Sequence, residues 1–377
     1  MGKRFSKSNE NGSIPLNLAA SLGLKFVINY LINKGKDINA QTRCGFTPLI
    51  AAILKQRTEI VSLLIENGAD PNKKDAYGWS PINLAIHYKA KDIIKLLADL
   101  GANLNASDEN GWSPLTRAIY HGKLEIVSLL INYNCDINMH DGKGWLPVSF
   151  AAWNGHYDIF SFLIDNGSDI HINNSNGNSL FYFCIAKREI NMINLLINRG
   201  ADVNLKDGCG YTPLAYAVRA GEMEIVSILI RSGSNVNDPN AVVGLSPLDC
   251  AINFGYFDMV RFLIDCGANV NSLNSKGLPP LTSAVLRSQC AIASLLIERG
   301  ANVNFQNTYG TSMLHIAAFG GGDLSLGGNH GIFEILCNHG AKFSTKDGNE
   351  NSAIELVMNT DKIDRFKAVL LYQTTCR

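Results

Sequence analysis

Residues 109–141 read ENGWSPLTRAIYHGKLEIVSLLINYNCDINMHD, and this stretch of 33 residues decides the fold because it recurs along the chain. Its glycine returns every 33 residues, with one residue inserted before the last three copies: Gly12, Gly45, Gly78, Gly111, Gly144, Gly177, Gly210, Gly244, Gly277 and Gly310. A period of this size indicates one supersecondary unit stacked on copies of itself, since a single unit cannot bury its own apolar face. We therefore predict one repeat array rather than several globular domains.

Each unit carries the signals of two helices. Ser113 is placed to cap the first helix with its side-chain oxygen, and Pro114 suits the first helical position. A second apolar segment follows, with Ile126 and Leu130 on one helical face. The cap signal repeats at Thr47-Pro48, Ser80-Pro81, Thr212-Pro213 and Ser246-Pro247. Left-handed residues predict the end of the second helix, at Gly68, Gly101, Gly200 and, in the quoted unit, Asn134.

These residues resemble the ankyrin repeat. The resemblance is carried by Gly-Phe-Thr-Pro-Leu at 45–49, Gly-Ala-Asp-Pro-Asn at 68–72 and Gly-Ala-Asn-Val-Asn at 300–304, and it covers about residues 9–372. It implies an all-α fold, an ankyrin-repeat solenoid of stacked antiparallel helix pairs with projecting hairpin loops. It also implies a protein-binding module, and we expect no enzymatic activity and no cofactor.

The period sets the expected boundaries. Residues 1–8 form a polar arm, and residues 348–377 form a C-terminal capping repeat and tail. Ten repeats fill residues 9–347, at 9–41, 42–74, 75–107, 108–140, 141–173, 174–206, 207–240, 241–273, 274–306 and 307–347. The last of these carries a Gly-rich insert near 320–331, which separates its two helices.

Three features depart from the pattern or invite another function. The sixth copy lacks its proline and has Cys184 in place of a small alanine, which either neutral drift or a designed joint explains. The Gly-rich insert lacks the Lys-Ser/Thr and the preceding strand of a phosphate-binding loop. The spacing of His315, His330, Cys337 and His339 fits no familiar zinc site, so we predict no metal. In the ankyrin pattern, the place of His315 is one whose side chain bonds the loop.

Composition narrows the classes of partner and compartment. Lys plus Arg and Asp plus Glu both number 33, so the chain lacks the positive field that nucleic-acid binding requires. Nine widely spaced cysteines without a Cys-x-x-Cys pair argue against a secreted disulfide framework and for a reducing, cytoplasmic location. No apolar stretch approaches the roughly 18 residues of a membrane span.

Aromatic side chains gather at the positions that the repeat leaves free to vary. They follow the repeat glycine in four consecutive units, and others stand at the ends of the first helices. We call this set the aromatic stripe: Phe46, Tyr77, Trp79, His87, Tyr88, Trp112, Tyr120, His121, Trp145, Trp153 and Tyr211. Rigid aromatics dominate interface hot spots, so the stripe predicts a partner-binding surface on the concave face, centred on the second to fifth copies. In a second interpretation, the aromatics only shield the loop stems from water.

Asparagines at the loop tips have a structural explanation instead, since Asn side chains satisfy backbone groups in tight turns. They stand at Asn39, Asn72, Asn105, Asn138, Asn204, Asn237, Asn271 and Asn304.

The amino terminus reads MGKRFSK, which places Gly2 and Ser6 as N-myristoylation requires. A single acyl chain anchors weakly, and Lys3, Arg4 and Lys7 would supply a second, electrostatic signal. The alternative is an ordinary polar arm. We expect contact with a membrane surface, at the inner face, only if Gly2 is lipidated.

The sequence thus favours a monomeric scaffold or adaptor that binds a protein partner through the aromatic stripe. The alternative is a single-target inhibitor, or a pathogen effector acting in the host cytosol, built on the same fold. An enzyme is disfavoured because the repeats leave no room for a separate catalytic domain.

Overall fold

A computed structural model of the chain describes residues 14–239, 244–319, 328–353 and 355. The chain divides into two compact units, Met1–Leu196 and Ile197–Arg377. The described residues form twenty helices and no strand, as the all-α expectation requires.

Helices α1 to α11 belong to the first unit, α12 contains the boundary, and α13 to α20 belong to the second. The first unit holds α1 (Ile14–Leu22), α2 (Lys25–Asn33), α3 (Pro48–Leu54), α4 (Thr58–Glu66), α5 (Pro81–His87), α6 (Lys91–Asp99), α7 (Pro114–Tyr120), α8 (Leu124–Asn132), α9 (Pro147–Trp153), α10 (Tyr157–Asp165) and α11 (Leu180–Ala186). After α12 (Ile190–Asn198) come α13 (Pro213–Ala220), α14 (Met223–Arg231), α15 (Pro247–Phe254), α16 (Phe257–Asp265), α17 (Pro280–Leu286), α18 (Cys290–Glu298), α19 (Met313–Phe319) and α20 (Gly328–Asn338).

The predicted caps start the first, odd-numbered helices. Ser113 Oγ accepts a hydrogen bond from the backbone N–H of Thr116 at 3.1 Å, with proline at the next position. Side chains of Thr47, Ser80, Thr212 and Ser246 cap α3, α5, α13 and α15 in the same way. The sixth copy keeps its cap without a proline, because Ser179 serves α11. Only the amide-free first position is lost there, so the helix still begins in register.

The second, even-numbered helices end as predicted. Gly68, Gly101 and Gly200 have positive φ, and Asn134 adopts φ 57° after α8. Asparagine tolerates this conformation better than most residues with a Cβ. The period therefore fixes both ends of each helix pair.

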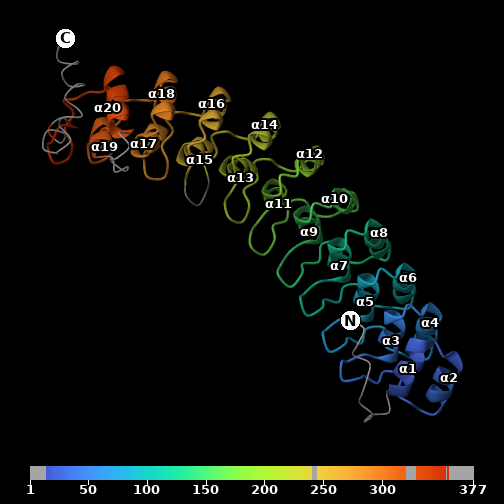
Figure 1. Ribbon diagram of the computed structural model, residues 1–377. Helices are drawn as coiled ribbons and strands as arrows, with labels where there is room; N and C mark the ends of the chain where they lie inside the picture. The colour runs from blue at the N-terminus through green and yellow to red at the C-terminus, as the bar shows by residue number, and fades with distance from the viewer. Residues whose placement is uncertain (1–13, 240–243, 320–327, 354, 356–377) are drawn as a thin grey trace. The chain divides into compact units, whose positions relative to one another are not determined.

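The core runs along the first helices. In α7 every residue from Pro114 to Ile119 is buried, whereas α8 buries only Ile126, Val127 and Leu130 on one face. Within the first unit, α5 packs on α3 and α7, and α6 packs on α4, so the helices form two layers from which the loops project (Figure 1). Burying one Leu or Ile contributes about 1.5–3 kcal/mol, so the continuous first-helix layer is the main source of stability.

The loop-tip asparagines link consecutive loops, as their structural explanation predicts. Asn39 Oδ1 accepts a hydrogen bond from the Asp70 backbone N–H at 2.8 Å, and Asn39 Nδ2 donates to the Gly68 carbonyl at 3.2 Å. In the second unit, Asn204 bonds the next loop at 2.7 and 3.0 Å. The side chains of Asn72, Asn105, Asn138, Asn237, Asn271 and Asn304 also accept from the following loop.

Two predicted features at the C-terminal side are only partly described. Helix α20 begins at Gly328, so the end of the predicted Gly-rich insert is helical and not loop. Residues 320–327 of the insert lie outside the described residues, as do 354 and 356–377 of the predicted cap. Gly2 lies outside them too.

Asp249 in α15 is a buried carboxylate, and only one of its two oxygens accepts hydrogen bonds. Its Oδ2 accepts hydrogen bonds from the Ser246 backbone N–H at 3.1 Å and from Ser246 Oγ at 2.8 Å. Its Oδ1 is buried without a partner. Burial raises the pKa of Asp249, and the Ser246 hydrogen bonds oppose this only in part.

Candidate functional site

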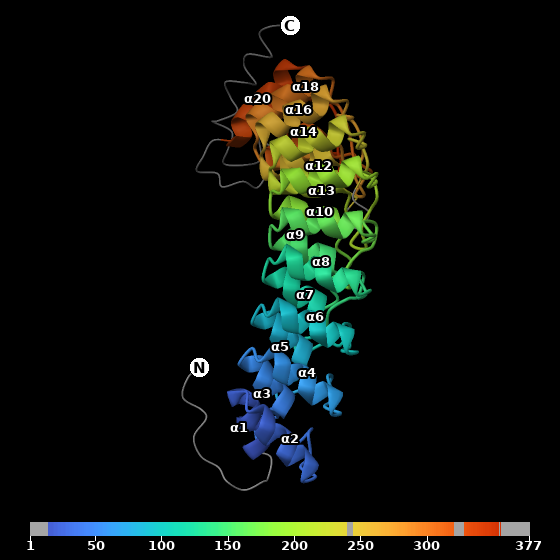
Figure 2. The same ribbon diagram turned by 90° about the vertical axis from the view of Figure 1, so that its right-hand side faces the viewer.

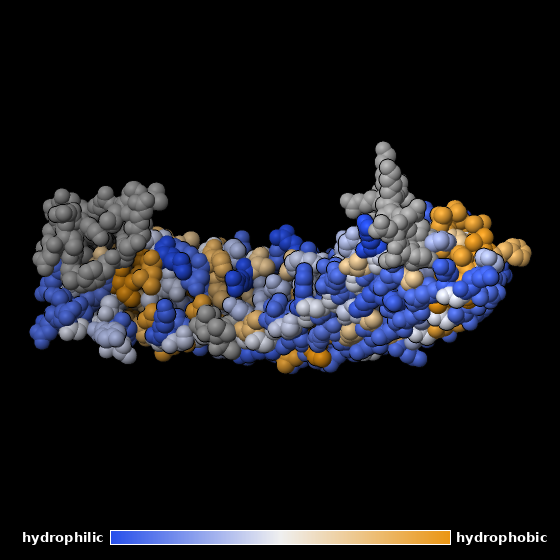
Figure 3. Space-filling view, turned by 90° about the horizontal axis from the view of Figure 1, so that it is seen from below, coloured by the Kyte–Doolittle hydropathy of each residue, from blue (hydrophilic) through white to orange (hydrophobic). Residues whose placement is uncertain are grey.

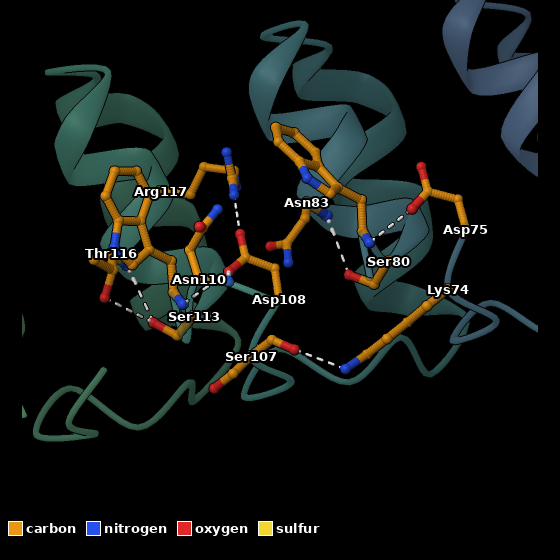
Figure 4. Close-up of polar contacts among 12 residues, drawn as sticks. Lys74, Asp75, Ser80, Asn83, Ser107, Asp108, Asn110, Ser113, Thr116 and Arg117 are labelled. Atoms are coloured by element: carbon orange, nitrogen blue, oxygen red, sulfur yellow. Dashed lines mark hydrogen bonds and ion pairs between the residues drawn. The ribbon is translucent and has the colours of Figure 1, made fainter. Parts of the chain in front are cut away.

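Tight loops hold the three tryptophans of the second to fourth loop stems. Asp108 Oδ1 accepts hydrogen bonds from the backbone N–H groups of Asn110 and Trp112, both at 2.9 Å (Figure 4). Between them Gly111 adopts φ 77°, and a Cβ there would lie 2.2 Å from the Gly142 backbone, so only glycine fits. Asp75 and Asp141 bond the backbone N–H groups of Trp79 and Trp145 alike. The backbone of each tryptophan is therefore fixed before any partner arrives.

Each of these tryptophans contacts the first helix of the next repeat. Trp112 lies 5.4 Å from Phe150 between ring centroids, and Trp145 lies 4.7 Å from Phe183. The third contact is with a cation, since the Arg117 guanidinium lies 3.7 Å from the Trp79 ring centroid. In all three pairs the partner residue comes 38 positions later. We call these six residues the ring ladder: Trp79, Arg117, Trp112, Phe150, Trp145 and Phe183.

Arg117 is the least expected member of the ring ladder. It is only 4% exposed, and it forms an ion pair with Asp108 Oδ2 inside the repeat (Figure 4). Its guanidinium lies 5.5 Å from the Trp112 ring as well, so two indole faces flank the charge. Burial lowers the pKa of Arg117, and the Asp108 carboxylate opposes that effect. Arg117 Nε has no hydrogen-bond partner.

Helix-end aromatics form a more exposed layer beside the ring ladder. His87 lies 5.2 Å from Trp79, Tyr120 5.1 Å from Trp112, and Trp153 5.7 Å from Trp145. The Trp79, Trp112 and Trp145 side chains are half-buried, whereas Tyr120 is 52% exposed. Tyr88 and Trp153 are exposed too, and the Lys187 Nζ lies 3.9 Å from the Trp153 ring centroid. The tryptophans thus belong partly to the scaffold, and the helix ends provide the accessible surface.

Two histidines lie together within this layer. The rings of His87 and His121 are 5.4 Å apart. Burial lowers the pKa of both, and the positive charge of Arg117 lowers them further, as does His87 in the case of His121. The lowered pKa values favour the neutral imidazoles at pH 7.

The remaining stripe residues lie apart from this cluster. Phe46 is half-buried, and its carbonyl accepts a hydrogen bond from Asn17 Nδ2 at 2.8 Å. Tyr77 is 53% exposed beside the second loop stem. Tyr211 belongs to the second unit, where its ring lies 4.9 Å from Tyr216. The described structure thus brings eight of the eleven together in the first unit: Trp79, His87, Tyr88, Trp112, Tyr120, His121, Trp145 and Trp153.

Sequence reasoning missed Arg117, Phe150 and Phe183. They occupy one aligned position of three consecutive first helices, followed by Tyr216 in the next copy. Comparing the residues at this aligned position across the repeats would have found them.

The repeat position occupied by Thr116, one residue before Arg117, can form a hydrogen bond to the next repeat. His315 and Asn17 occupy this position in their own repeats and form such a bond. His315, as predicted from its place in the pattern, bonds the loop: its Nδ1 lies 2.6 Å from Ser312 Oγ, and its Nε2 lies 2.9 Å from the Asn351 carbonyl oxygen. In the first repeat Asn17 reaches the equivalent carbonyl. Asn83 occupies the same place in α5, but it is fully buried and neither atom of its amide has a partner.

Other kinds of site find little support in the described part of the chain. It contains no group of three or more His, Cys, Asp or Glu residues arranged to hold a metal ion. Among its helices none combines the length and apolar character needed to cross a membrane.

Comparison with known proteins identifies the family of these repeats. A family model for ankyrin repeats, built of three copies, matches residues 16–108, 82–174, 180–274 and 250–347. A search of curated proteins finds no significant match.

Proposed function

Since the chain belongs to the ankyrin-repeat family, whose repeats mediate protein–protein interaction, we propose that it is a scaffold or adaptor that binds a protein partner through the aromatic stripe. The observation that carries the proposal is the accessible layer of Tyr88, Tyr120 and Trp153, supported from beneath by the ring ladder. Large aromatic surfaces on a soluble protein indicate an interaction site.

Rigid display is the mechanism. Asp75, Asp108 and Asp141 fix the loop stems, and neighbouring repeats fix the indole rings, so few side-chain torsions remain to be ordered on binding. Immobilising a flexible side chain costs about 0.5–1.5 kcal/mol, and a prearranged surface avoids much of that cost. The partner therefore needs an apolar or aromatic segment that spans several repeats.

The test replaces accessible aromatics and leaves the ring ladder intact. A variant combining Tyr77→Ser, Tyr120→Ser and Trp153→Ser is compared with one combining Leu124→Ser, Tyr157→Ser and Ile172→Ser, which are also exposed in the first unit. Partners captured from cell lysate by the wild type are identified, and their affinity is measured by calorimetry with purified proteins. We expect a loss of at least about tenfold in the stripe variant only, since hot-spot residues cost about 2 kcal/mol or more when truncated.

Equal affinity for the stripe variant and the wild type would refute the stripe as the binding surface, provided that circular dichroism shows both to be folded. The same purified partner also separates an adaptor from a single-target inhibitor or effector. An adaptor binds a second protein at the same time, whereas an inhibitor changes the activity of one.

We place this function inside the cell, in a reducing compartment. All eight cysteines in the described residues are free thiols, and burial raises the pKa of Cys135 to about 12. A buried thiol of that kind is inert, which suits a structural role.

A further inference from the structure

The first repeat exposes an apolar face at the end of the first unit. Helix α1 packs on α2 and α3 (Figure 2). Apolar side chains of both α1 and α2 are exposed. Phe26 is 91% exposed and Tyr30 61%, and the space-filling view shows a hydrophobic patch over this end (Figure 3). We call this set the end face: Leu18, Leu22, Leu24, Phe26, Val27 and Tyr30.

Helix formation does not account for Phe26. In six later copies the equivalent position holds an acidic residue in the first turn of the second helix: Glu59, Asp92, Glu125, Asp158, Glu224 and Asp258. Negative charge there stabilises a helix through its dipole, and phenylalanine gives that up. An apolar residue at this place therefore indicates contact with an apolar environment.

Basic residues surround the end face. Phe26, Tyr30 and Lys34 follow one another at four-residue spacing, so they form one stripe along α2 and its C-cap. The Lys34 Nζ lies 5.7 Å from the Tyr30 ring centroid. Lys25 and Lys36 are exposed nearby. From residue 14 to residue 46 there are four basic residues, Lys25, Lys34, Lys36 and Arg43, and one acidic residue, Asp37.

This charge distribution selects the occupant. A second copy docked about a two-fold axis would bring the lysines of both copies together, which like-charge repulsion opposes. An anionic lipid surface attracts them, and Phe and Tyr side chains flanked by lysines are typical of segments lying at the boundary between headgroups and acyl chains.

We propose that the end face docks on an anionic membrane surface, with Phe26 and Tyr30 entering the interface and Lys25, Lys34 and Lys36 contacting lipid headgroups. This contact is separate from partner binding at the aromatic stripe and does not require an acyl chain on Gly2. It would orient the array with its first repeat at the membrane.

The experiment is co-sedimentation with vesicles of phosphatidylcholine alone and of phosphatidylcholine with phosphatidylserine, using full-length protein made in bacteria without an acyltransferase. Phe26→Glu introduces the residue type that six other copies carry at this position, so the fold is kept, and it is combined with Tyr30→Ser. Tyr157→Glu is the matched control, since Tyr157 is an exposed aromatic at the start of α10.

We expect the wild type and the control to sediment with the phosphatidylserine vesicles only, and less so at raised salt. The apparent affinity of the double variant falls by at least about tenfold, because it loses two inserting rings and gains a negative charge. Wild-type protein that stays in the supernatant, or a double variant that binds as the wild type does, overturns the proposal. A dimer in sedimentation velocity that the double variant abolishes would assign the face to a second copy and overturn it too.

Discussion

In the buried Asp108–Arg117 pair, replacing the aspartate should destabilise the protein more than replacing the arginine. Asp108→Asn keeps an oxygen that can accept the two loop hydrogen bonds, as Asn174 Oδ1 does in its own loop. It leaves Arg117 buried without a counter-charge, however, and breaking a buried pair in this way costs about 3–5 kcal/mol.

Arg117→Leu should cost less, about 1–2 kcal/mol, because it mainly removes the cation–π contact with Trp79. The equivalent residue one repeat earlier is Leu84, and one repeat later it is Phe150. Their loop aspartates, Asp75 and Asp141, are as buried as Asp108 and have no ion pair among the described residues. The fold therefore tolerates the carboxylate alone, but not the guanidinium alone.

The assay is urea denaturation of the wild type, the two single variants and the double variant, followed by far-ultraviolet circular dichroism. In the Arg117→Leu background, Asp108→Asn should add less than about 1 kcal/mol, because no buried charge is left unpaired. Equal costs for the two single changes, or a double variant as unstable as the sum of both, would refute this account of the pair.

Three further changes test other parts of the structure. Gly111→Ala should lower the thermal midpoint far more than Gly101→Ala, since both have positive φ but only the first would place a Cβ 2.2 Å from backbone; equal shifts would contradict the steric argument. Asn83→His should raise the free energy of unfolding by about 1 kcal/mol, because an imidazole can bond the next loop as His315 does; urea denaturation showing a loss would count against it. Asp249→Asn should stabilise the protein at pH 7 and not at pH 4. A raised folded-state pKa means that wild-type stability falls as the pH rises from the unfolded-state pKa through the folded-state one, and asparagine does not titrate. Thermal melts of both proteins at the two pH values check this, and a variant that is less stable at both would refute it.

The helices and loops could be predicted because their causes are local. Ser113, Pro114 and Asn134 act on backbone groups within one turn, so their positions in the sequence predict where helices begin and end. Most of the loop asparagines, such as Asn39, bond a backbone N–H group 31 residues later, and the repeat period makes that separation predictable. The separation is 32 residues for Asn237 and 38 for Asn304, where the chain carries insertions. The start of α20 inside the Gly-rich insert was not predicted, since glycine composition alone favours a loop there.

The sequence by itself determined the repeat, its family and the chemical type of the surface, because a period and a row of aromatics are properties of the chain. Only the tertiary structure decided which aromatics are accessible. Stacking puts Trp112 against Phe150 and Trp79 against Arg117, residues 38 positions apart, and leaves Tyr120 exposed. Burial depends on which side chains meet across the interface between repeats, and no pattern within a single repeat specifies that.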